Sequence, residues 1–257
     1  MKLQQKLRLK ILEMHFIANA GHIGSSLSVI DILIAIFFKS KKDDDTFILS
    51  KGHAASALYT CLNELGRISD EEIKTFYNDG SRLPAHPPAM QFEDIPFATG
   101  SLGHGFPLSV GVAKANKLLK KNNYVFVVLS DGDTNEGTTW EAAHFAVKHK
   151  LSNLIVIIDK NCIQGFDRNN DAIGDTAKNE VFKAIGFETF EINGHNINTI
   201  YDTIENCKNS DNEFPKLIIA NTIKGKGVSF MENTIDWHYW PMTEDLYKKA
   251  VEEVKNK

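Results

Sequence analysis

The chain has 257 residues, of which 42% are hydrophobic, so it is long and apolar enough to bury the core of one large domain. Its 29 basic and 33 acidic residues leave a formal charge of -4, which gives no electrostatic case for binding nucleic acid or an anionic membrane. Three cysteines without a CxxC pair argue against a disulfide framework and a zinc cluster.

The first elements along the chain are predicted to be helices. Apolar residues recur at helical spacing over residues 3–19 and 27–38, and the small-residue stretch NAGHIGSS, which contains His22, separates them. The first segment keeps returning to Lys and Arg, which is not typical of a signal peptide. The apolar run VIDILIAIFF is too short to span a bilayer and contains Asp31. We therefore expect a cytoplasmic protein.

A strand, a helix and a long loop follow. TFILS predicts a short buried strand, and KGHAASALYTCLNELG predicts a helix that begins at His53 and ends before Gly66. Residues 79–105 hold four of the seven prolines and several glycines. A loop of this length is unusual within a compact domain, so we expect it to have a function.

Strands and helices then alternate to the end of the chain. Strands are predicted at 124–129, 154–159, 187–192 and 216–222, and helices at about 106–120, 138–150, 178–185, 196–207 and 243–255. The strands are apolar throughout, which favours an α/β fold with a parallel sheet and helices on both faces. Ligands of such sheets bind at the C-terminal strand ends. His53, Asp131, Asn161 and Lys224 all follow predicted strands, so we expect them at one edge.

The segment SDGDTNEG brings three carboxylates into one loop after a buried strand. These are Asp131, Asp133 and Glu136. The next segment has capping-box spacing between Thr138 and Glu141, so we expect a helix to start there. A strand, a glycine-containing loop and a helix are the usual surroundings of a bound phosphate.

No Lys or Arg occurs between Lys121 and Lys148 to neutralise such a phosphate, so a divalent metal between the phosphate and the carboxylates is indicated. A right-handed crossover would place Asp131 and Asn161 at neighbouring strand ends. With the backbone carbonyl of Ile163, they offer the hard oxygen ligands that Mg²⁺ prefers. An ordinary acidic turn and an Asn turn fit this spacing equally well.

Six ordered segments resemble the N-terminal domain of transketolases. They are AGHIGSSLS, LSKGHAASALY, LPAHP, TGSLGHGFPLSVGVA, the Asp-Gly and Asn pair of the thiamine diphosphate fingerprint, and TIKGKGVSFMENTIDWH. No single segment is specific, but the ordered set covers almost the whole chain. The resemblance implies one thiamine diphosphate-binding domain over residues 1–257, with thiamine diphosphate and Mg²⁺ as cofactors.

The resemblance also implies roles for individual residues. The implied metal ligands are Asp131, Asn161 and the Ile163 carbonyl. The implied cofactor-binding residues are His53, Ser101, Leu102, Gly103, Asp131, Gly132, Asn161 and His238. His22, His86 and His238 correspond to histidines that move protons to and from the substrate. Glu136 corresponds to a glutamate at the subunit interface that communicates with the cofactor-activating glutamate of the partner.

Other polar residues are expected to have plainer roles. Asp133 is interpreted as a solvated loop carboxylate, His144 as a packed interface residue, and the lysines of KGKG, at 224–227, as ordinary rim charges. His15, His149 and His195 are expected to be structural or solvated. Ser130 stands where the fingerprint usually has its first glycine, and we expect it to make the same turn.

The resemblance covers only half of the family's active site. The half that holds the aminopyrimidine and its glutamate is not in this sequence, so a separate second subunit is implied, with two copies of each. The implied reaction is transfer of a two-carbon ketol unit from a ketose or ketose phosphate to an aldose. Two alternatives remain open: the alpha subunit of a thiamine diphosphate-dependent 2-oxo acid dehydrogenase, and a non-catalytic metal- or nucleotide-binding α/β module.

Overall fold

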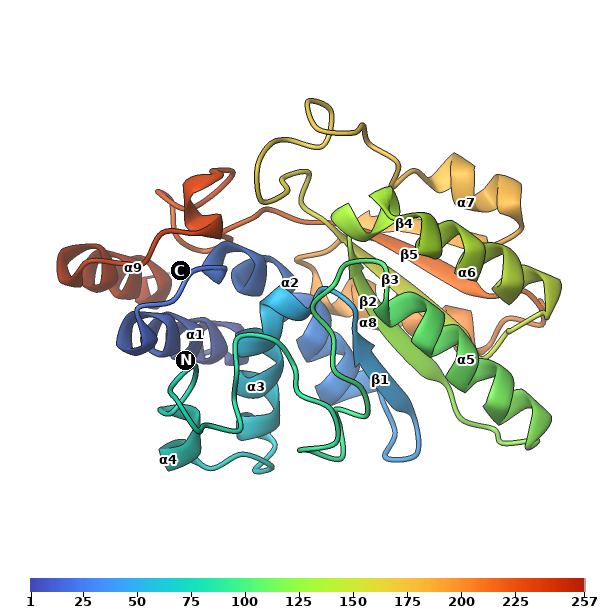
Figure 1. Ribbon diagram of the computed structural model, residues 1–257, viewed down its shortest axis with the longest axis horizontal. Coiled ribbons are helices and arrows are strands. Elements are labelled where there is room, and N and C mark those ends of the chain that lie inside the picture. Colours follow the sequence, from blue (N-terminus) through green and yellow to red (C-terminus); the bar gives the residue numbers. More distant parts are fainter. Residues whose placement is uncertain (257) are drawn as a thin grey trace.

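Five parallel strands form the centre of the fold in the computed structural model, which describes residues 1–256 (Figure 1). The strands are β1 (Thr46–Leu49), β2 (Val125–Ser130), β3 (Leu154–Lys160), β4 (Glu188–Asn193) and β5 (Lys216–Asn221). Their order in the sheet is β1-β2-β3-β5-β4, and every neighbouring pair is parallel. The predicted α/β fold with a parallel sheet is therefore confirmed.

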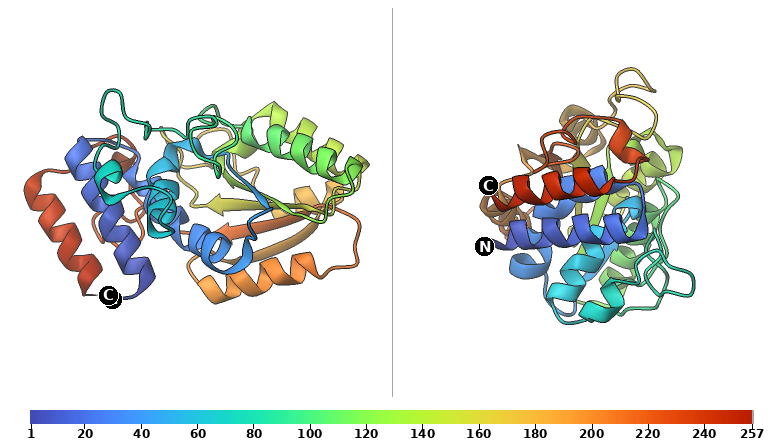
Figure 2. Two further views of the ribbon diagram at one scale, coloured as in Figure 1. Left: turned by 90° about the horizontal axis from the view of Figure 1, so that it is seen from below. Right: turned by 90° about the vertical axis from the view of Figure 1, so that its left-hand side faces the viewer.

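Helices cover both faces of this sheet (Figure 2). The helices are α1 (Leu3–Ala18), α2 (Ile23–Ala35), α3 (Ala55–Glu64), α4 (Asp70–Ile73), α5 (Gly105–Leu118), α6 (Gly137–Lys148), α7 (Asn179–Ile185), α8 (Ile197–Lys208) and α9 (Glu244–Lys255). In the left view of Figure 2, α5 and α6 lie above the sheet and α8 lies below it.

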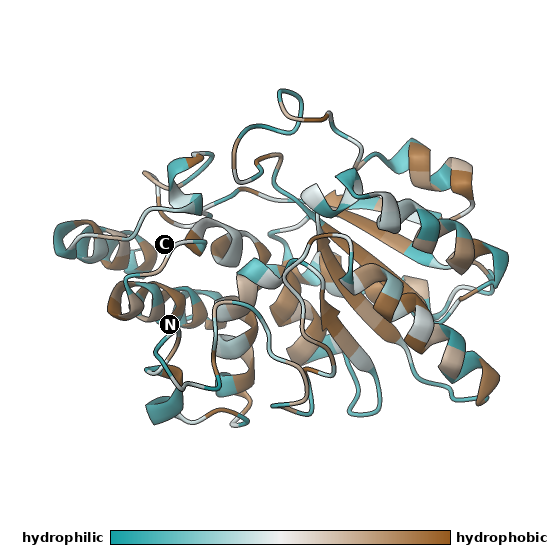
Figure 3. Ribbon diagram, in the orientation of Figure 1, coloured by the Kyte–Doolittle hydropathy of each residue, from teal (hydrophilic) through white to brown (hydrophobic). Residues whose placement is uncertain are grey.

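Alternate residues of the central strands supply the two sides of the core. Phe126 and Val128 of β2 belong to the core cluster that includes α1, α2 and α3, whereas Val125 and Val127 belong to the cluster that includes α5 and α6. All six residues of β2 are buried, and all except the last, Ser130, are apolar; the central strands are drawn mainly in brown in Figure 3. The continuous apolar strand pattern follows from this double coverage.

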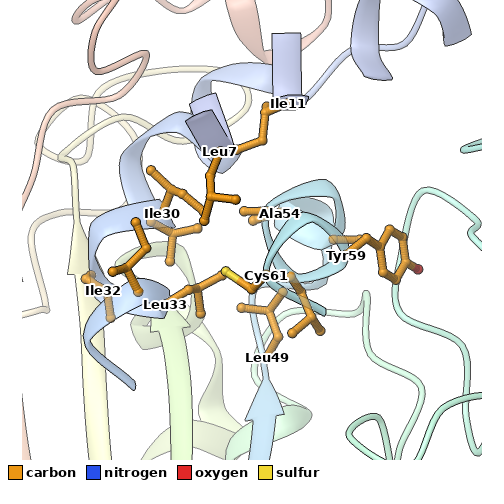
Figure 4. Packing of buried hydrophobic residues seen from close by; sticks show 14 of the residues in the cluster. Leu7, Ile11, Ile30, Ile32, Leu33, Leu49, Ala54, Tyr59 and Cys61 are labelled. Atoms are coloured by element: carbon orange, nitrogen blue, oxygen red, sulfur yellow. The ribbon is translucent and has the colours of Figure 1, made fainter. Parts of the chain in front are cut away.

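The core around β1 joins segments from the first quarter of the chain (Figure 4). Leu7 of α1, Leu33 of α2 and Cys61 of α3 are all buried there, as is Leu49 at the end of β1. The Cys61 thiol has a raised pKa because it is desolvated by burial. Cys61 therefore acts as a small hydrophobic core residue rather than as a reactive thiol.

Helix α2 is longer than the sequence analysis assumed. It begins at Ile23 instead of 27 and continues into a π-helical turn, Ile36–Ser40. The combined 18 residues have a mean hydropathy of 1.7 and meet the length and composition of a membrane span. However, 89% of this segment is buried inside the protein. A core helix passes the same test, so this is weak evidence for a membrane span.

The predicted capping box at the start of α6 is wrong. The N-cap residue is Glu136, which makes no side-chain capping bond, and the helix begins at Gly137. The hydroxyl of Thr138 instead donates to the carbonyl oxygen of Gly103 at 2.9 Å. This bond attaches the long loop before α5 to the start of α6. The spacing of Thr138 fits a capping residue, but its hydroxyl bonds to Gly103, which is distant in the sequence.

Candidate active site

The predicted residues meet at the C-terminal edge of the sheet. His53 follows β1, Asp131 follows β2, Asn161 follows β3 and Lys224 follows β5. Ser130 is paired with Asp159 in the β2–β3 register, so the residues that follow these strands lie beside one another. In Figure 1 the long loop after β3, drawn in yellow, extends from this edge. The expectation of a shared edge is confirmed.

The Asp131 carboxylate is held by N–H groups in a buried position. Gly132 N–H donates to Oδ1 at 3.0 Å, and Cys162 N–H and the Asn169 amide donate to Oδ2 at 2.6 and 3.0 Å. Asp131 is 3% exposed. Burial raises the pKa of its carboxyl to about 6, although the Asn169 hydrogen bond opposes the shift. A buried carboxylate with this pKa gains stability from a bound cation.

The oxygens around Asp131 fit Mg²⁺. The Asn161 side-chain oxygen accepts from Ile163 N–H at 3.1 Å, and both residues line the same cavity as Asp131. The buried side-chain oxygen of Asn169 has no hydrogen-bond partner among the described residues. No group of three His, Cys, Asp or Glu side chains suited to a metal occurs within residues 1–256, so a metal here would depend on the Asp131 carboxylate together with amide and carbonyl oxygens. Such a donor set suits Mg²⁺.

Four histidines gather around the opening of this site. The ring centroid of His22 lies 5.8 Å from that of His53, 6.0 Å from that of His86 and 4.8 Å from that of His238. Burial lowers the pKa of His22 to about 4 and that of His238 to about 3. Burial also holds the pKa values of His53 and His86 below the usual range. Near neutral pH these imidazoles are uncharged and can both donate and accept hydrogen bonds.

Acid is expected to destabilise the protein through a buried histidine near this group. His15 is 2% exposed, its Nδ1 lies 3.2 Å from the Ala20 oxygen, and burial lowers its pKa to about 4. The unfolded chain therefore binds a proton that the folded chain does not, between about pH 6.5 and 4. Stability is fully present above that window and falls as the pH drops. We expect His15 to contribute about 2 kcal/mol of the loss between pH 7 and 5.

Urea unfolding of the wild type and His15→Gln at both pH values measures this contribution. The variant should lose less stability on acidification than the wild type. An equal loss in both proteins would show that other groups cause the acid sensitivity.

Asp133 is a buried structural residue, so its interpretation as a solvated carboxylate is wrong. It is 0% exposed and accepts from four donors: Ser50 Oγ, Gly103 N–H, Ser130 N–H and Ser130 Oγ, at 2.7, 2.7, 2.7 and 2.8 Å. One carboxylate thus joins the ends of β1 and β2 to the glycine loop. Ser130 makes the turn by bonding to Asp133.

The loop SLG, residues 101–103, reaches the site through its middle residue. Leu102 lines the cavity, whereas Ser101 is exposed and lies outside it. Gly103 has φ 77°, and a Cβ there would lie 2.5 Å from the Glu136 Cβ, so the close approach requires glycine. Glu136 is exposed beside this loop and does not line the cavity. The structure therefore separates Glu136, Ser101 and Gly103 from the cavity lining.

Lys224 is a buried site residue, so its interpretation as a rim charge is wrong. It is 0% exposed, and its Nζ lies 2.9 Å from His238 Nδ1 and donates to the carbonyl oxygens of Ile163 and Gln164 at 3.2 and 3.1 Å. Burial lowers its pKa to about 7. Its position shortly after β5 could have indicated a site residue, because β5 ends at the site.

The other histidines separate into structural and surface residues. His15 is buried, and His195 lies between Asp31 Oδ2 at 2.8 Å and the N–H of Ile223 at 2.9 Å, so both are structural. His149 lies beside Lys114 at the surface. His144 is exposed in this chain, so it is not packed within the described residues.

Nine predicted residues line one cavity of about 270 Å³. They are His22, His53, His86, Leu102, Asp131, Gly132, Asn161, Ile163 and His238. The cavity has an oxygen-rich end at Asp131 and an imidazole-rich end at His22. A ligand that carries a metal-bound anionic group at one end and a reacting carbon at the other suits this division. The fold and this cavity define a cofactor-binding α/β domain.

Comparisons with known proteins identify the family. Residues 2–256 match the family model described as transketolase, thiamine diphosphate binding domain. The chain therefore belongs to the transketolase family and forms its N-terminal, thiamine diphosphate-binding part. This match favours a transketolase over the two alternatives that the sequence left open.

Relatives of similar length are named as transketolase subunits. The chain is 36% identical to an apulose-4-phosphate transketolase subunit from Actinobacillus succinogenes, over 99% of this chain and 95% of that protein. It is 35% identical to a 6-deoxy-6-sulfo-D-fructose transketolase subunit from a Clostridium species, over 92% of this chain and 89% of that protein. These relatives have nearly the same extent as this chain.

A solved transketolase is longer. The crystal structure of transketolase from Campylobacter jejuni matches 99% of this chain with a TM-score of 0.86 and 33% identity. This chain covers 43% of that protein. The match includes the sheet and the site edge, and the rest of the longer protein has no counterpart here.

Proposed function

We propose that this chain is the N-terminal subunit of a two-subunit transketolase that transfers a two-carbon ketol unit from a ketose or ketose phosphate to an aldose. The observation that carries the proposal is the single cavity, which brings Asp131, Asn161 and Ile163 together with His22, His86 and His238. Oxygen ligands at one end and neutral imidazoles at the other would suit Mg²⁺ and thiamine diphosphate next to a sugar substrate.

The chain's own residues would divide the work as follows. Asp131, Asn161 and the Ile163 carbonyl would hold Mg²⁺, and Gly132 would lie against the diphosphate. The thiamine diphosphate, when bound, supplies the nucleophilic carbon and the electron sink for breaking the carbon–carbon bond of the sugar. His22 and His86 would exchange protons with sugar hydroxyl and carbonyl oxygens, which neutral imidazoles are able to do.

His238 and Lys224 are placed to act together. The His238 Nδ1 lies 2.9 Å from Lys224 Nζ, so its orientation is set by the lysine. Because burial lowers the Lys224 pKa to about 7, whereas that of His238 is lowered to about 3, Lys224 is the member of the pair that gains and loses a proton near neutral pH. A bound diphosphate nearby would favour the charged lysine.

A second protein chain is part of the proposal. The naming of the relatives as subunits, and the 43% coverage of the Campylobacter jejuni transketolase, support a partner that carries the pyrimidine half of the site. Its glutamate would activate the cofactor, and the exposed Glu136 would lie at the interface. We propose an assembly of two copies of each chain in the cytoplasm.

Cofactor retention tests the split site. We would purify the chain alone and together with the product of the neighbouring gene, with Mg²⁺ and thiamine diphosphate present, and quantify the bound cofactor. We expect stoichiometric retention and ketol transfer only in the joint complex. Appreciable ketol transfer by the isolated chain would refute the split site, and no retention by either preparation would refute the cofactor assignment.

His86→Ala is expected to lower turnover while leaving cofactor affinity nearly unchanged. His86 lines the cavity at the imidazole end, apart from the hydrogen bonds that hold Asp131 and Asn161, so its removal takes away a proton-transfer group. General acid–base catalysis is worth about 100- to 10,000-fold, and we expect a decrease in kcat of at least about 100-fold. The change in kcat is compared with the change in cofactor affinity, which is measured by titrating the two-subunit complex with thiamine diphosphate. Equal losses of turnover and cofactor affinity would contradict a catalytic role.

A further inference from the structure

A second cavity adjoins the first. It has a volume of about 410 Å³ and shares four lining residues with the cofactor cavity: His22, His53, His86 and Tyr239. Since these side chains line both cavities, they lie at the boundary between them, which we call the wall. Tyr239 is the one member of the wall that the sequence analysis did not identify.

Tyr239 extends from the histidines to the loop after β3. Its ring centroid lies 4.7 Å from that of His238 and 6.1 Å from that of His22, both in edge-on orientation. Its hydroxyl lies against Gly165, where a Cβ would come within 2.6 Å of the Tyr239 oxygen. Because residue 165 is a glycine, there is room for the Tyr239 hydroxyl beside its main chain.

Main-chain contacts fix the position of the Tyr239 backbone, from which this ring extends. Tyr239 N–H donates to the Asp236 oxygen at 3.0 Å, and a Cβ at Gly21 would lie 2.7 Å from the Tyr239 carbonyl oxygen. The segment is therefore tightly packed at its main chain. The side chain itself is 59% exposed, so replacing it changes the wall without removing a core residue.

The second cavity has an uncharged lining. Beyond the four shared residues it includes His15, Phe76, Tyr77, Pro84 and Ala85. Among these described lining residues there is no Asp, Glu, Lys or Arg. Burial lowers the pKa values of the histidines, so they are neutral near pH 7. A phosphate or sulfonate would find no counter-charge here. Hydroxyl groups would find imidazole partners, and carbon-bound hydrogens would find apolar surface.

We propose that the second cavity receives the uncharged, hydroxyl-bearing chain of an aldose, and that Tyr239 limits the length of chain that fits beside His22 and His238. This assignment rests on the proposed ketol-transfer function and adds a specificity-determining residue to it. Removing the ring merges the two cavities and admits a longer chain. Removing only the hydroxyl leaves the wall in place.

Three variants of the two-subunit complex test the proposal. They are Tyr239→Ala, Tyr239→Phe and the control Trp240→Ala, whose side chain is also 59% exposed but lines neither cavity. Hydroxypyruvate serves as donor, with glycolaldehyde and D-ribose as short and long uncharged acceptors. The measured quantity is the D-ribose to glycolaldehyde ratio of kcat/KM. We expect it to rise at least about 10-fold in Tyr239→Ala and to stay within about twofold in the other two.

An unchanged or lower ratio in Tyr239→Ala overturns the proposal, as does an equal rise in Trp240→Ala. A second measurement does not depend on turnover: D-ribose binding to the same complexes by ligand-observed NMR should strengthen only in Tyr239→Ala. No turnover with glycolaldehyde in any complex would refute the ketol-transfer function. Unchanged D-ribose binding in Tyr239→Ala would refute the role of Tyr239.

Discussion

Asp131→Asn is expected to abolish retention of Mg²⁺ and thiamine diphosphate while leaving the cofactor-free protein at least as stable as the wild type. The wild-type carboxylate is buried, and burial raises its pKa to about 6. Because the folded-state pKa is above the unfolded value, stability falls as the pH rises from about 4 to about 6, and ionisation of this group costs about 2 to 3 kcal/mol at pH 7. The amide removes that charge and loses one hydrogen-bond acceptor for N–H donors.

The loss of function follows from the same change. Asp131 is the only carboxylate among the described residues that line the cavity, so an amide there removes the negative charge that would hold Mg²⁺. We expect a loss of cofactor affinity of at least about 100-fold. Thermal unfolding with and without Mg²⁺ and thiamine diphosphate provides the measurement. Wild type in complex with its partner should show a cofactor-dependent rise in Tm, and the variant should show none.

Asp133→Asn is the matched control, since it makes the same change two residues away. Asp133 accepts four hydrogen bonds, so loss of its charge should lower stability by about 2 to 4 kcal/mol without cofactor. The two substitutions are thus expected to move the stability of the cofactor-free protein in opposite directions. A fall in stability of similar size in both would contradict the metal-site interpretation of Asp131.

Breaking the buried ion pair beneath the site is expected to have the largest effect on stability. Lys51 and Asp159 form this pair, and both side chains are 0% exposed. Asp159 also accepts from the hydroxyls of Ser28, at 2.7 Å, and Thr222. The pair thereby joins the ends of β1, β3 and β5 to α2. Lys51→Met leaves a buried carboxylate without its cation, which costs about 3 to 5 kcal/mol.

A double-mutant cycle separates the coupling energy between Lys51 and Asp159 from their other contributions to stability. Lys51→Met, Asp159→Leu and the double variant would be unfolded in urea without cofactor. The double variant should be more stable than the sum of the single changes predicts, by at least about 2 kcal/mol. The exposed pair Lys150–Glu213, with side chains 52% and 66% exposed, is the control, and Lys150→Met should cost less than about 1 kcal/mol. Additive effects of the buried pair would contradict direct coupling.

The sheet and the meeting of Asp131 with Asn161 were predictable because they depend on local patterns. Apolar strands followed by polar residues gave β2 and β3 to within a residue at each end, and their adjacency followed from the crossover rule. Asp131 and Asn161 therefore came together without any knowledge of the structure. The resemblance to transketolases added His22, His86 and His238, which lie far apart in the sequence.

The errors concern residues whose partners are distant in sequence. The local sequence indicates a solvated residue at Asp133, because its donors, Ser50 and Gly103, are on other segments. The local sequence indicates a surface charge at Lys224, because its burial depends on Ile163 and His238. Thr138 has the spacing of a cap, yet bonds to Gly103. A local pattern gives the type of a side chain and its element, whereas the tertiary fold decides its partner.

The contact between the two ends of the chain has a consequence for biosynthesis. His22 N–H donates to the His238 carbonyl oxygen at 2.7 Å, and Phe16 of α1 stacks on Tyr247 of α9 at 4.3 Å between ring centroids. A ribosome synthesises His22 long before His238. The nascent chain is thus able to form α1, α2 and the sheet before His238 joins the active site. We therefore expect cofactor capture only after the segment that carries His238 has left the exit tunnel.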